Sequence, residues 1–359
     1  MAKTISFVEK QNSKIEAKKL YNKAFLCVYE VELKKKYSDD EVKTRLEKKA
    51  DQLDKKLRKQ VENNNKASYR NRTRIWELDF VRGLVIIGML IDHFFFDFEG
   101  LFTSYNFSNL PQFYLDIGAF ANLYWVHPVR VTFRFIGIFF LFLVSGISTQ
   151  FSRNPIRRSL IVIGAGALMS VAFLIVAKVT GSMEDLVIVG AIGGIGICML
   201  IYGLFALPFK KHPQLHEAFT LGIAVAILIA WGFVSYNNAR DTSNFWFYYN
   251  GYAYSIPIVR YKDLGENIWG VLLGTKYFGS DWIGLFPGLG YMFLGGFIGQ
   301  TVYRNRKSIF GRFNESLNRN TKFVTIPGQY SLWFYLSHQV IYIIILGGLA
   351  LLMGAKLVL

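Results

Sequence analysis

One stretch, residues 74–99, places ionisable side chains inside an apolar run long enough to cross a membrane. A helix needs about 20 apolar residues to span the hydrocarbon core, and charged groups at that depth usually face a protein interior or a water-filled cavity. The apolar middle of the stretch carries Asp79, Arg82, Asp92, His93 and Asp97. A signal anchor with charges snorkelling from its ends is the simpler interpretation, but it accounts for the first two alone. We therefore expect a membrane-embedded helix with a functional polar face.

The spacing within this stretch puts several of these groups on one face of the helix. Arg82 and His93 are eleven residues apart, which brings them within about 20° of each other around a helix and about 16 Å apart along it. Asp79 precedes Arg82 by three residues and Asp97 follows His93 by four, and residues at these spacings are neighbours on a helix. The helix should thus present an acid–base pair near each membrane surface.

The chain as a whole is predicted to be an all-α polytopic membrane protein with about seven transmembrane helices. Hydrophobic residues make up 52% of its 359 residues. Seven apolar runs have nearly the length that a membrane helix needs, at 79–98, 131–151, 159–179, 186–208, 217–236, 282–303 and 329–353. The two cysteines, Cys27 and Cys198, do not suggest a disulfide or a metal site, and no metal is expected.

Residues 1–74 form a segment of a different kind. They hold 21 Lys and Arg against 11 Asp and Glu, so most of the formal net charge of +16 lies here. A capping box at 38–41 precedes an apolar stripe at helical spacing, and 15–33 is a second helical candidate. We predict a soluble, basic, helical extension at 1–74, either a helical hairpin or a coiled coil that can hold a homo-oligomer. Contact of its lysines with anionic lipid and a fully solvated helix are the alternatives. The membrane domain follows at 75–359.

Basic loops predict how the spans are oriented. If the N-terminus is cytoplasmic, the loops at 153–158, 210–211 and 304–322 also lie inside, as the positive-inside rule requires. The C-terminus and the long loops 99–130 and 237–281 then lie outside, and these loops are rich in aromatic residues that suit either sugar stacking or an interfacial belt. The positive charge thus sets topology, so we expect a multi-pass protein of the cell membrane, surrounded by lipid, with no nucleic-acid partner.

Five segments together resemble one family. They are E-L-D-F-V-R-G-L-V-I-I-G-M-L-I-D-H-F-F-F-D at 77–97, F-L-F-L-V-S-G-I-S at 140–148, G-A-I-G-G-I-G-I-C-M-L at 190–200, D-W-I-G-L-F-P-G-L-G-Y-M-F-L-G-G-F-I-G at 281–299 and S-L-W-F-Y-L-S-H-Q at 331–339. In this order and spacing, residues 75–353 are similar to the bacterial relatives of the catalytic domain of heparan-alpha-glucosaminide N-acetyltransferase, a group of transmembrane acyltransferases. The resemblance implies transfer of an acetyl group from cytosolic acetyl-CoA to an extracytoplasmic sugar, glycan or amino-sugar acceptor.

Roles in such a reaction follow for the residues near the inner surface and in the centre. The donor phosphates need cations, so we expect Arg82, held by Asp79, to bind acetyl-CoA. His93, oriented by Asp97, would act as the base or accept the acetyl group itself. His338, in the last span, either lines the acyl path or packs against its neighbours. Further donor contacts are expected from the next inner loop, through Arg153, Arg157 and Arg158.

Other residues are candidates for the acceptor side. His127 is the rival of His93, because the eukaryotic members of the family are thought to carry the catalytic histidine in the first outer loop, whereas the bacterial relatives generally have the helix histidine. Arg130 and Arg134 would clamp an acidic glycan or only snorkel. The motif resemblance places Asp281 and Trp282 at the acceptor mouth. Two further histidines, His212 and His216, flank an inner loop and are expected to be solvated.

A transporter or flippase of a glycan or lipid-linked precursor is the alternative function, since it would use the same polar face without covalent chemistry. Transporters often contain internal repeats, and none is evident in this sequence. The choice between O- and N-acetylation and the formation of an acetyl-histidine intermediate are both left open by the sequence.

Overall fold

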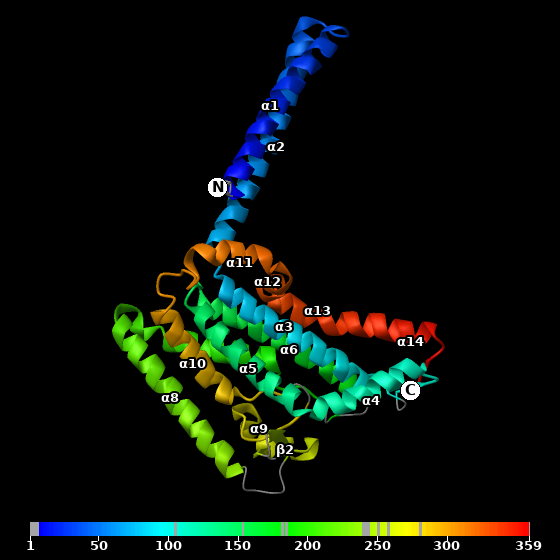
Figure 1. Cartoon of the computed structure of the whole chain (residues 1–359), viewed down its shortest axis with the longest axis vertical. Helices are drawn as coiled ribbons and strands as arrows, with labels where there is room; N and C mark the ends of the chain where they lie inside the picture. The colour runs from blue at the N-terminus through cyan, green and yellow to red at the C-terminus, as the bar shows by residue number, and fades with distance from the viewer. Residues whose placement is uncertain are drawn as a thin grey trace, which may run out of the picture. The chain divides into compact units, whose positions relative to one another are not determined.

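The computed structural model describes residues 7–103, 106–152, 154–180, 183, 186–238, 245–249, 252–256, 259–279 and 282–358. The chain divides into two compact units, Met1–Arg74 and Ile75–Leu359, which are drawn in Figure 1. Helices dominate both units, as the sequence predicts.

The first unit is a helical hairpin. Helix α1 (Phe7–Lys34) packs against α2 (Asp39–Thr73), and the predicted capping box is present at Ser38 and Glu41. The apolar stripe of α2 turns toward α1, so that Leu33, Val42 and Leu57 are buried. A hydrogen bond from the ammonium of Lys18 to Gln60 Oε1, 2.7 Å long, links the two helices farther along.

The second unit has a helix in each of the seven predicted apolar runs. These are α3 (Trp76–Phe96), α5 (Pro128–Thr149), α6 (Pro155–Thr180), α7 (Ala191–Phe205), α8 (Pro213–Asn238), α10 (Leu285–Thr301) and α13 (Ser331–Tyr342), which continues through the π-helical turn η6 (Ile343–Gly347) into α14 (Gly348–Leu352). Among the described residues, four stretches are long and apolar enough to cross a membrane, Pro128–Thr149, Pro155–Ile175, Pro213–Val234 and Ser331–Leu352. Helix α3 carries several charges, and α7 and α10 are shorter, so their crossing stays a prediction.

Short elements connect these helices. The helical ones are η1 (Asp97–Leu101), α4 (Gln112–Val126), η3 (Pro208–Lys211), η4 (Tyr261–Asp263), α9 (Leu264–Leu273), η5 (Gly311–Phe313), α11 (Asn314–Asn320) and α12 (Lys322–Gln329). The all-α prediction fits the described residues, and two small antiparallel ladders accompany the helices. The strands β2 (Phe245–Tyr249) and β3 (Tyr252–Ile256) form a hairpin, and β1 (Phe107–Ser108) pairs with β4 (Lys356–Leu357). The second ladder fastens the C-terminal residues beside the loop that follows α3.

Helices α5 and α10 form the centre of the second unit, and glycines let their backbones touch. A Cβ atom added to Gly295 would lie 2.0 Å from the carbonyl oxygen of Leu143, and one added to Gly146 would lie 2.2 Å from that of Met292. Small residues at helix crossings allow this kind of close approach in membrane proteins. The sequence analysis did not predict which helices would meet in this way.

The short helix α12 crosses the beginning of α3 in the same manner. A Cβ atom on Gly83 would meet the carbonyl oxygen of Val324 at 1.9 Å, and one on Gly328 would meet that of Asp79 at 1.8 Å. Around this crossing the indole nitrogen of Trp76 donates to Thr321 Oγ1 at 2.7 Å. We call the side of the unit where α3 begins the Trp76 side, and the side where it ends the Phe96 side.

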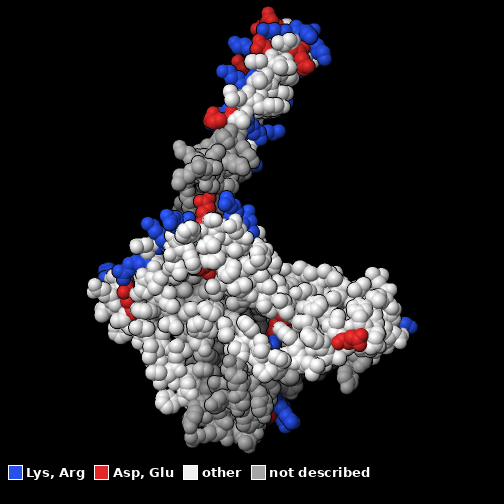
Figure 2. All heavy atoms as spheres, in the orientation of Figure 1, with Lys and Arg blue, Asp and Glu red and all other residues white. Residues whose placement is uncertain are grey.

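Charged side chains are unevenly spread over the surface of this unit. Figure 2 shows a largely uncharged flank, with Lys and Arg gathered along the edge near α11 and the end of α10. The exposed cations of that segment are Arg304, Arg306, Lys307, Arg312, Arg319 and Lys322. An uncharged flank beside a basic edge fits a membrane protein whose basic loops stay on one side.

Candidate active site

Two histidines meet where α13 packs along α3. The ring centroids of His93 and His338 lie 4.8 Å apart, and the rings are almost perpendicular, with an interplanar angle of 85°. His338 is buried, and the ring of Tyr335 lies against both of them. Each histidine was a candidate from the sequence alone, and the structure brings them into contact with each other.

The backbone fixes the tautomer of both rings. The Nδ1 atom of His93 lies 2.9 Å from the carbonyl oxygen of Met89, and that of His338 lies 2.7 Å from the carbonyl oxygen of Tyr335. A carbonyl oxygen only accepts, so Nδ1 is the donor in each ring, and a neutral ring then carries its lone pair on Nε2. His93 Nε2 is therefore an atom that can take a proton or attack an acyl carbon.

Asp97 belongs to this cluster through a different contact from the one predicted. Its side chain is fully buried, and Oδ1 accepts a hydrogen bond of 2.5 Å from Gln339 Nε2. In the described part of the chain, Oδ2 has no hydrogen-bond partner. The expected hydrogen bond from the His93 imidazole to Asp97 is not among these contacts, and His93 Nδ1 lies against the Met89 carbonyl oxygen. Asp97 instead ties the end of α3 to the residue beside His338.

An ion pair joins Asp92, the residue before His93, to the buried Arg130 of α5. Arg130 donates to both carboxylate oxygens of Asp92, from Nε and from Nη2, each at 2.6 Å. Its guanidinium also lies 3.7 Å from the ring centre of Trp125, and Tyr124 donates to Asp92 at 3.2 Å. Burial and the charge of Asp92 raise the pKa of Tyr124, which keeps that hydroxyl protonated as a donor. The sequence analysis did not predict this pairing. A signal was present, because Asp92 near the end of one span and Arg130 near the start of the next are opposite charges on the same side of the membrane domain.

Three of the basic and acidic candidates cluster toward the Trp76 side. Arg82 donates to Ser148 Oγ at 2.7 Å and to Asp79 at 3.4 Å, so the ion pair predicted from their spacing is present. Arg158, from the next loop, donates to the carbonyl oxygen of Ser148 at 3.3 Å. The guanidinium groups of Arg82 and Arg158 thus both bond to Ser148, near the end of α5. Arg157 is exposed.

The comparison with known proteins decides the family. The family model described as heparan-alpha-glucosaminide N-acetyltransferase, catalytic, matches residues 74–340. The chain belongs to this family. The match includes His93, Asp92 and His338, whereas the N-terminal hairpin falls outside it. No curated protein and no solved structure matches the chain.

The other candidate site residues within the family match have described contacts with residues other than His93 and His338. His127 is exposed and caps α5, where its Nδ1 accepts from the backbone N–H of Val129 at 3.3 Å. Trp282 donates from its indole to the carbonyl oxygen of Val271 at 3.0 Å, which anchors it against α9. Arg134 is half-buried. The predicted site residues Arg153 and Asp281 lie outside the described residues.

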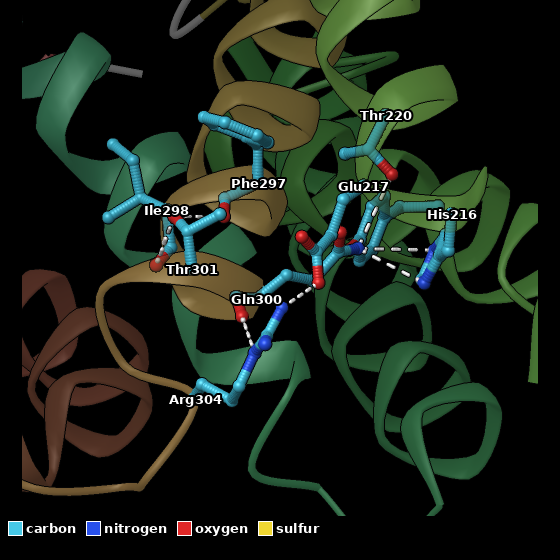
Figure 3. A network of polar contacts seen from close by, with 9 residues as sticks. His216, Glu217, Thr220, Phe297, Ile298, Gln300, Thr301 and Arg304 are labelled. Atoms are coloured by element: carbon cyan, nitrogen blue, oxygen red, sulfur yellow. Dashed lines mark hydrogen bonds and ion pairs between the residues drawn. The ribbon is translucent and has the colours of Figure 1, made fainter. Parts of the chain in front are cut away.

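A second polar network of the family domain corrects one expectation. His216 was expected to be solvated, but it is half-buried and stacks on Phe209 at a centroid distance of 5.6 Å. Figure 3 shows its ring beside the amide of Gln300, whose Nε2 lies 3.1 Å from His216 Nδ1 and 3.3 Å from Thr220 Oγ1. The same nitrogen donates to the hydroxyl of Tyr202 at 2.9 Å. This network joins α7, α8 and α10 near the Trp76 side.

Proposed function

We propose that the protein is a membrane acetyltransferase, which transfers an acetyl group from cytosolic acetyl-CoA to a sugar or amino-sugar acceptor on the opposite side of the membrane. Membership of the family supports acetyl transfer, and the apolar helices support a membrane location. The observation that carries the proposal is the contact of His93 with His338, because it places an imidazole with a defined lone pair inside a helical bundle.

In the proposed reaction, His93 moves one proton while the acetyl group passes from sulfur to the acceptor. The amine or hydroxyl of the acceptor attacks the thioester carbonyl, a new C–N or C–O bond forms and the C–S bond breaks. His93 Nε2 takes the proton that the acceptor loses and delivers it to the CoA thiolate as it leaves. If Nε2 attacks the thioester first, the acetyl group passes through an acetyl-imidazole before it reaches the acceptor. In both routes His338 packs against the ring that reacts.

The donor is proposed to approach from the Trp76 side, which would be the cytosolic one. The basic edge supports that orientation through the positive-inside rule. Arg82 and Arg158 meet at Ser148, and guanidinium groups suit phosphate binding. The eleven residues from Arg82 to His93 correspond to about 16 Å along α3, which an extended pantetheine arm can cover. Asp79 would hold Arg82 in position.

The acceptor is proposed to bind on the Phe96 side, where aromatic rings lead away from His93. Phe96 has its ring centre 6.5 Å from that of His93 and 5.4 Å from that of Trp125. Aromatic faces of this kind can stack against a sugar. Arg130 already donates to Asp92, so clamping an acidic glycan would require this ion pair to open.

The test is transfer of radiolabelled acetyl from acetyl-CoA by purified protein in liposomes. His93→Ala should lower the rate by about 10²–10⁴, the usual effect of losing a general base, and should leave binding of acetyl-CoA largely intact. His127→Ala is the matched control, since it removes an exposed histidine from the same family domain. We expect that variant to retain substantial activity.

Two results would overturn the assignment. An inactive His127→Ala beside an active His93→Ala would move the chemistry to the loop before α5. Movement of a glycan across the membrane by wild-type protein, without any transfer of label, would identify a transporter instead.

A further inference from the structure

Helix α1 of the N-terminal hairpin has two apolar faces, and α2 covers only one of them. The covered face includes Leu26 and Tyr29, which are half-buried, and Leu33, which is buried. The opposite face carries Leu20 and Val31, which are 69% and 59% exposed. On a helix these two positions are about 20° apart, so they form one line. Helix α2, by contrast, has no exposed large apolar side chain between residues 39 and 62.

The exposed line has the spacing of a helix–helix seam. Its members, Ala17, Leu20, Ala24, Cys27 and Val31, alternate by three and four residues, and all are exposed. This alternation keeps a narrow stripe facing one partner helix, and the two alanines allow a close approach. In Figure 2 uncharged side chains are visible between the charged ones on the hairpin.

The charges beside this seam suit a second copy of the same helix. Glu16 and Glu30 flank the seam together with Lys23. In a parallel pair, the flanking rule of coiled coils puts Glu30 of one copy beside the first residue after α1 of the other copy, Lys35. An antiparallel pair that sets Ala24 opposite Cys27 puts Glu30 beside Lys23 instead. A helix that lies on an anionic membrane would flank its apolar face mainly with cations, whereas this flank holds Glu16 and Glu30 as well as Lys23 and Lys34, and the two glutamates pair with lysines of their own helix.

We propose that two copies of this chain associate through α1, with the seam Ala17–Leu20–Ala24–Cys27–Val31 at their interface. The pairing lies outside the family match, so it is independent of the catalytic proposal. Because these side chains do not face α2, changing them should leave the hairpin folded, which circular dichroism of each variant verifies.

Cysteine cross-linking of the full-length protein in native membranes tests the seam. Oxidation with copper phenanthroline should link Cys27 to Cys27 in a parallel pair, or Cys27 to the new thiol of Ala24→Cys in an antiparallel one. Cys27→Ser leaves only the buried Cys198 and should give no product. The positional control is Lys19→Cys in the Cys27→Ser background, because residue 19 is exposed and lies about 100° around the helix from residue 20.

The strength of association provides the second measurement. Leu20→Glu should weaken dimer formation in diluted liposomes at least about tenfold, a change of about 1.4 kcal/mol, whereas Lys19→Glu should weaken it much less. The proposal fails if neither seam thiol is linked, if Lys19→Cys is linked equally well, or if Leu20→Glu dimerises like the wild type. It also fails if the product has a mass other than that of two copies, which would show a different partner.

Discussion

Replacement of Asp92 by asparagine should destabilise the membrane unit strongly, because it leaves the guanidinium of Arg130 buried without its counter-charge. The side chain of Arg130 is only 5% exposed and that of Asp92 is 20% exposed. Removing one member of a buried ion pair typically costs about 3–5 kcal/mol. Trp125 remains under the guanidinium after the change, and the partial exposure of Asp92 admits some water. We therefore expect a loss of about 3 kcal/mol, at the low end of that range.

The double variant Asp92→Asn with Arg130→Gln should recover much of this loss. Two neutral amides can hydrogen-bond to each other, and no charge stays buried, so the sum of the single losses should exceed the double loss by about 2 kcal/mol. Asp116→Asn is the matched control, since Asp116 is an exposed carboxylate on α4 that bonds only to Gln112 among the described contacts. A surface change of that kind should stay within about 0.5 kcal/mol of the wild type.

The measurement is the free energy of unfolding in mixed micelles, from a titration with sodium dodecyl sulfate followed by circular dichroism. The reasoning is refuted if Asp92→Asn unfolds like Asp116→Asn, or if the losses of the two single variants add up in the double variant. Additive losses would mean that Asp92 and Arg130 do not depend on each other.

Three further outcomes test the fold, the donor site and the topology. Gly295→Ala should lower the free energy of unfolding by about 1–3 kcal/mol, because its methyl group would overlap the α5 backbone, while Gly222→Ala, which has open space around it, should be neutral in the same titration. Arg82→Gln should weaken acetyl-CoA binding about tenfold in calorimetry, as the loss of a charge-assisted contact does, and an unchanged affinity would leave Arg82 a packing role only. A reporter fused after Leu359 should be detected outside the cell and one in the 305–325 loop inside, and a reversed result for either would invalidate the proposed orientation.

Features that depend on near neighbours in the chain could be predicted from the sequence. The helices lie where the apolar runs are, because hydrophobic content and length are local properties. Asp79 and Arg82 lie about one helical turn apart, so their ion pair follows from their spacing in the sequence. His93 and His338 stood out because an ionisable group within an apolar span is uncommon.

Contacts between helices could not be predicted, because nothing in one segment specifies which face of another it will meet. Asp97 illustrates this, because its position four residues after His93 predicts that it orients the imidazole. It lies one α-helical turn after His93, because its backbone N–H donates to the His93 carbonyl oxygen, but its carboxylate bonds to Gln339 on α13. Arg130 and Asp92 each stood out as charges, but their pairing depends on how α5 packs against α3.

The burial of the last helix has a consequence for how the bilayer acts on the histidine pair. Only 17% of the apolar window in Ser331–Leu352 is buried within the protein, against 39% in Pro128–Thr149. In a membrane, lipid chains would therefore face most of the helix that carries His338, while His93 lies on a helix that crosses α12 through two glycines. Such a helix responds to hydrophobic thickness by tilting. Because Gln339 and Tyr342 of the same helix bond to α3 and the residue after it, we expect the lipid composition of the host membrane to alter the distance between the two imidazoles only as far as these contacts allow.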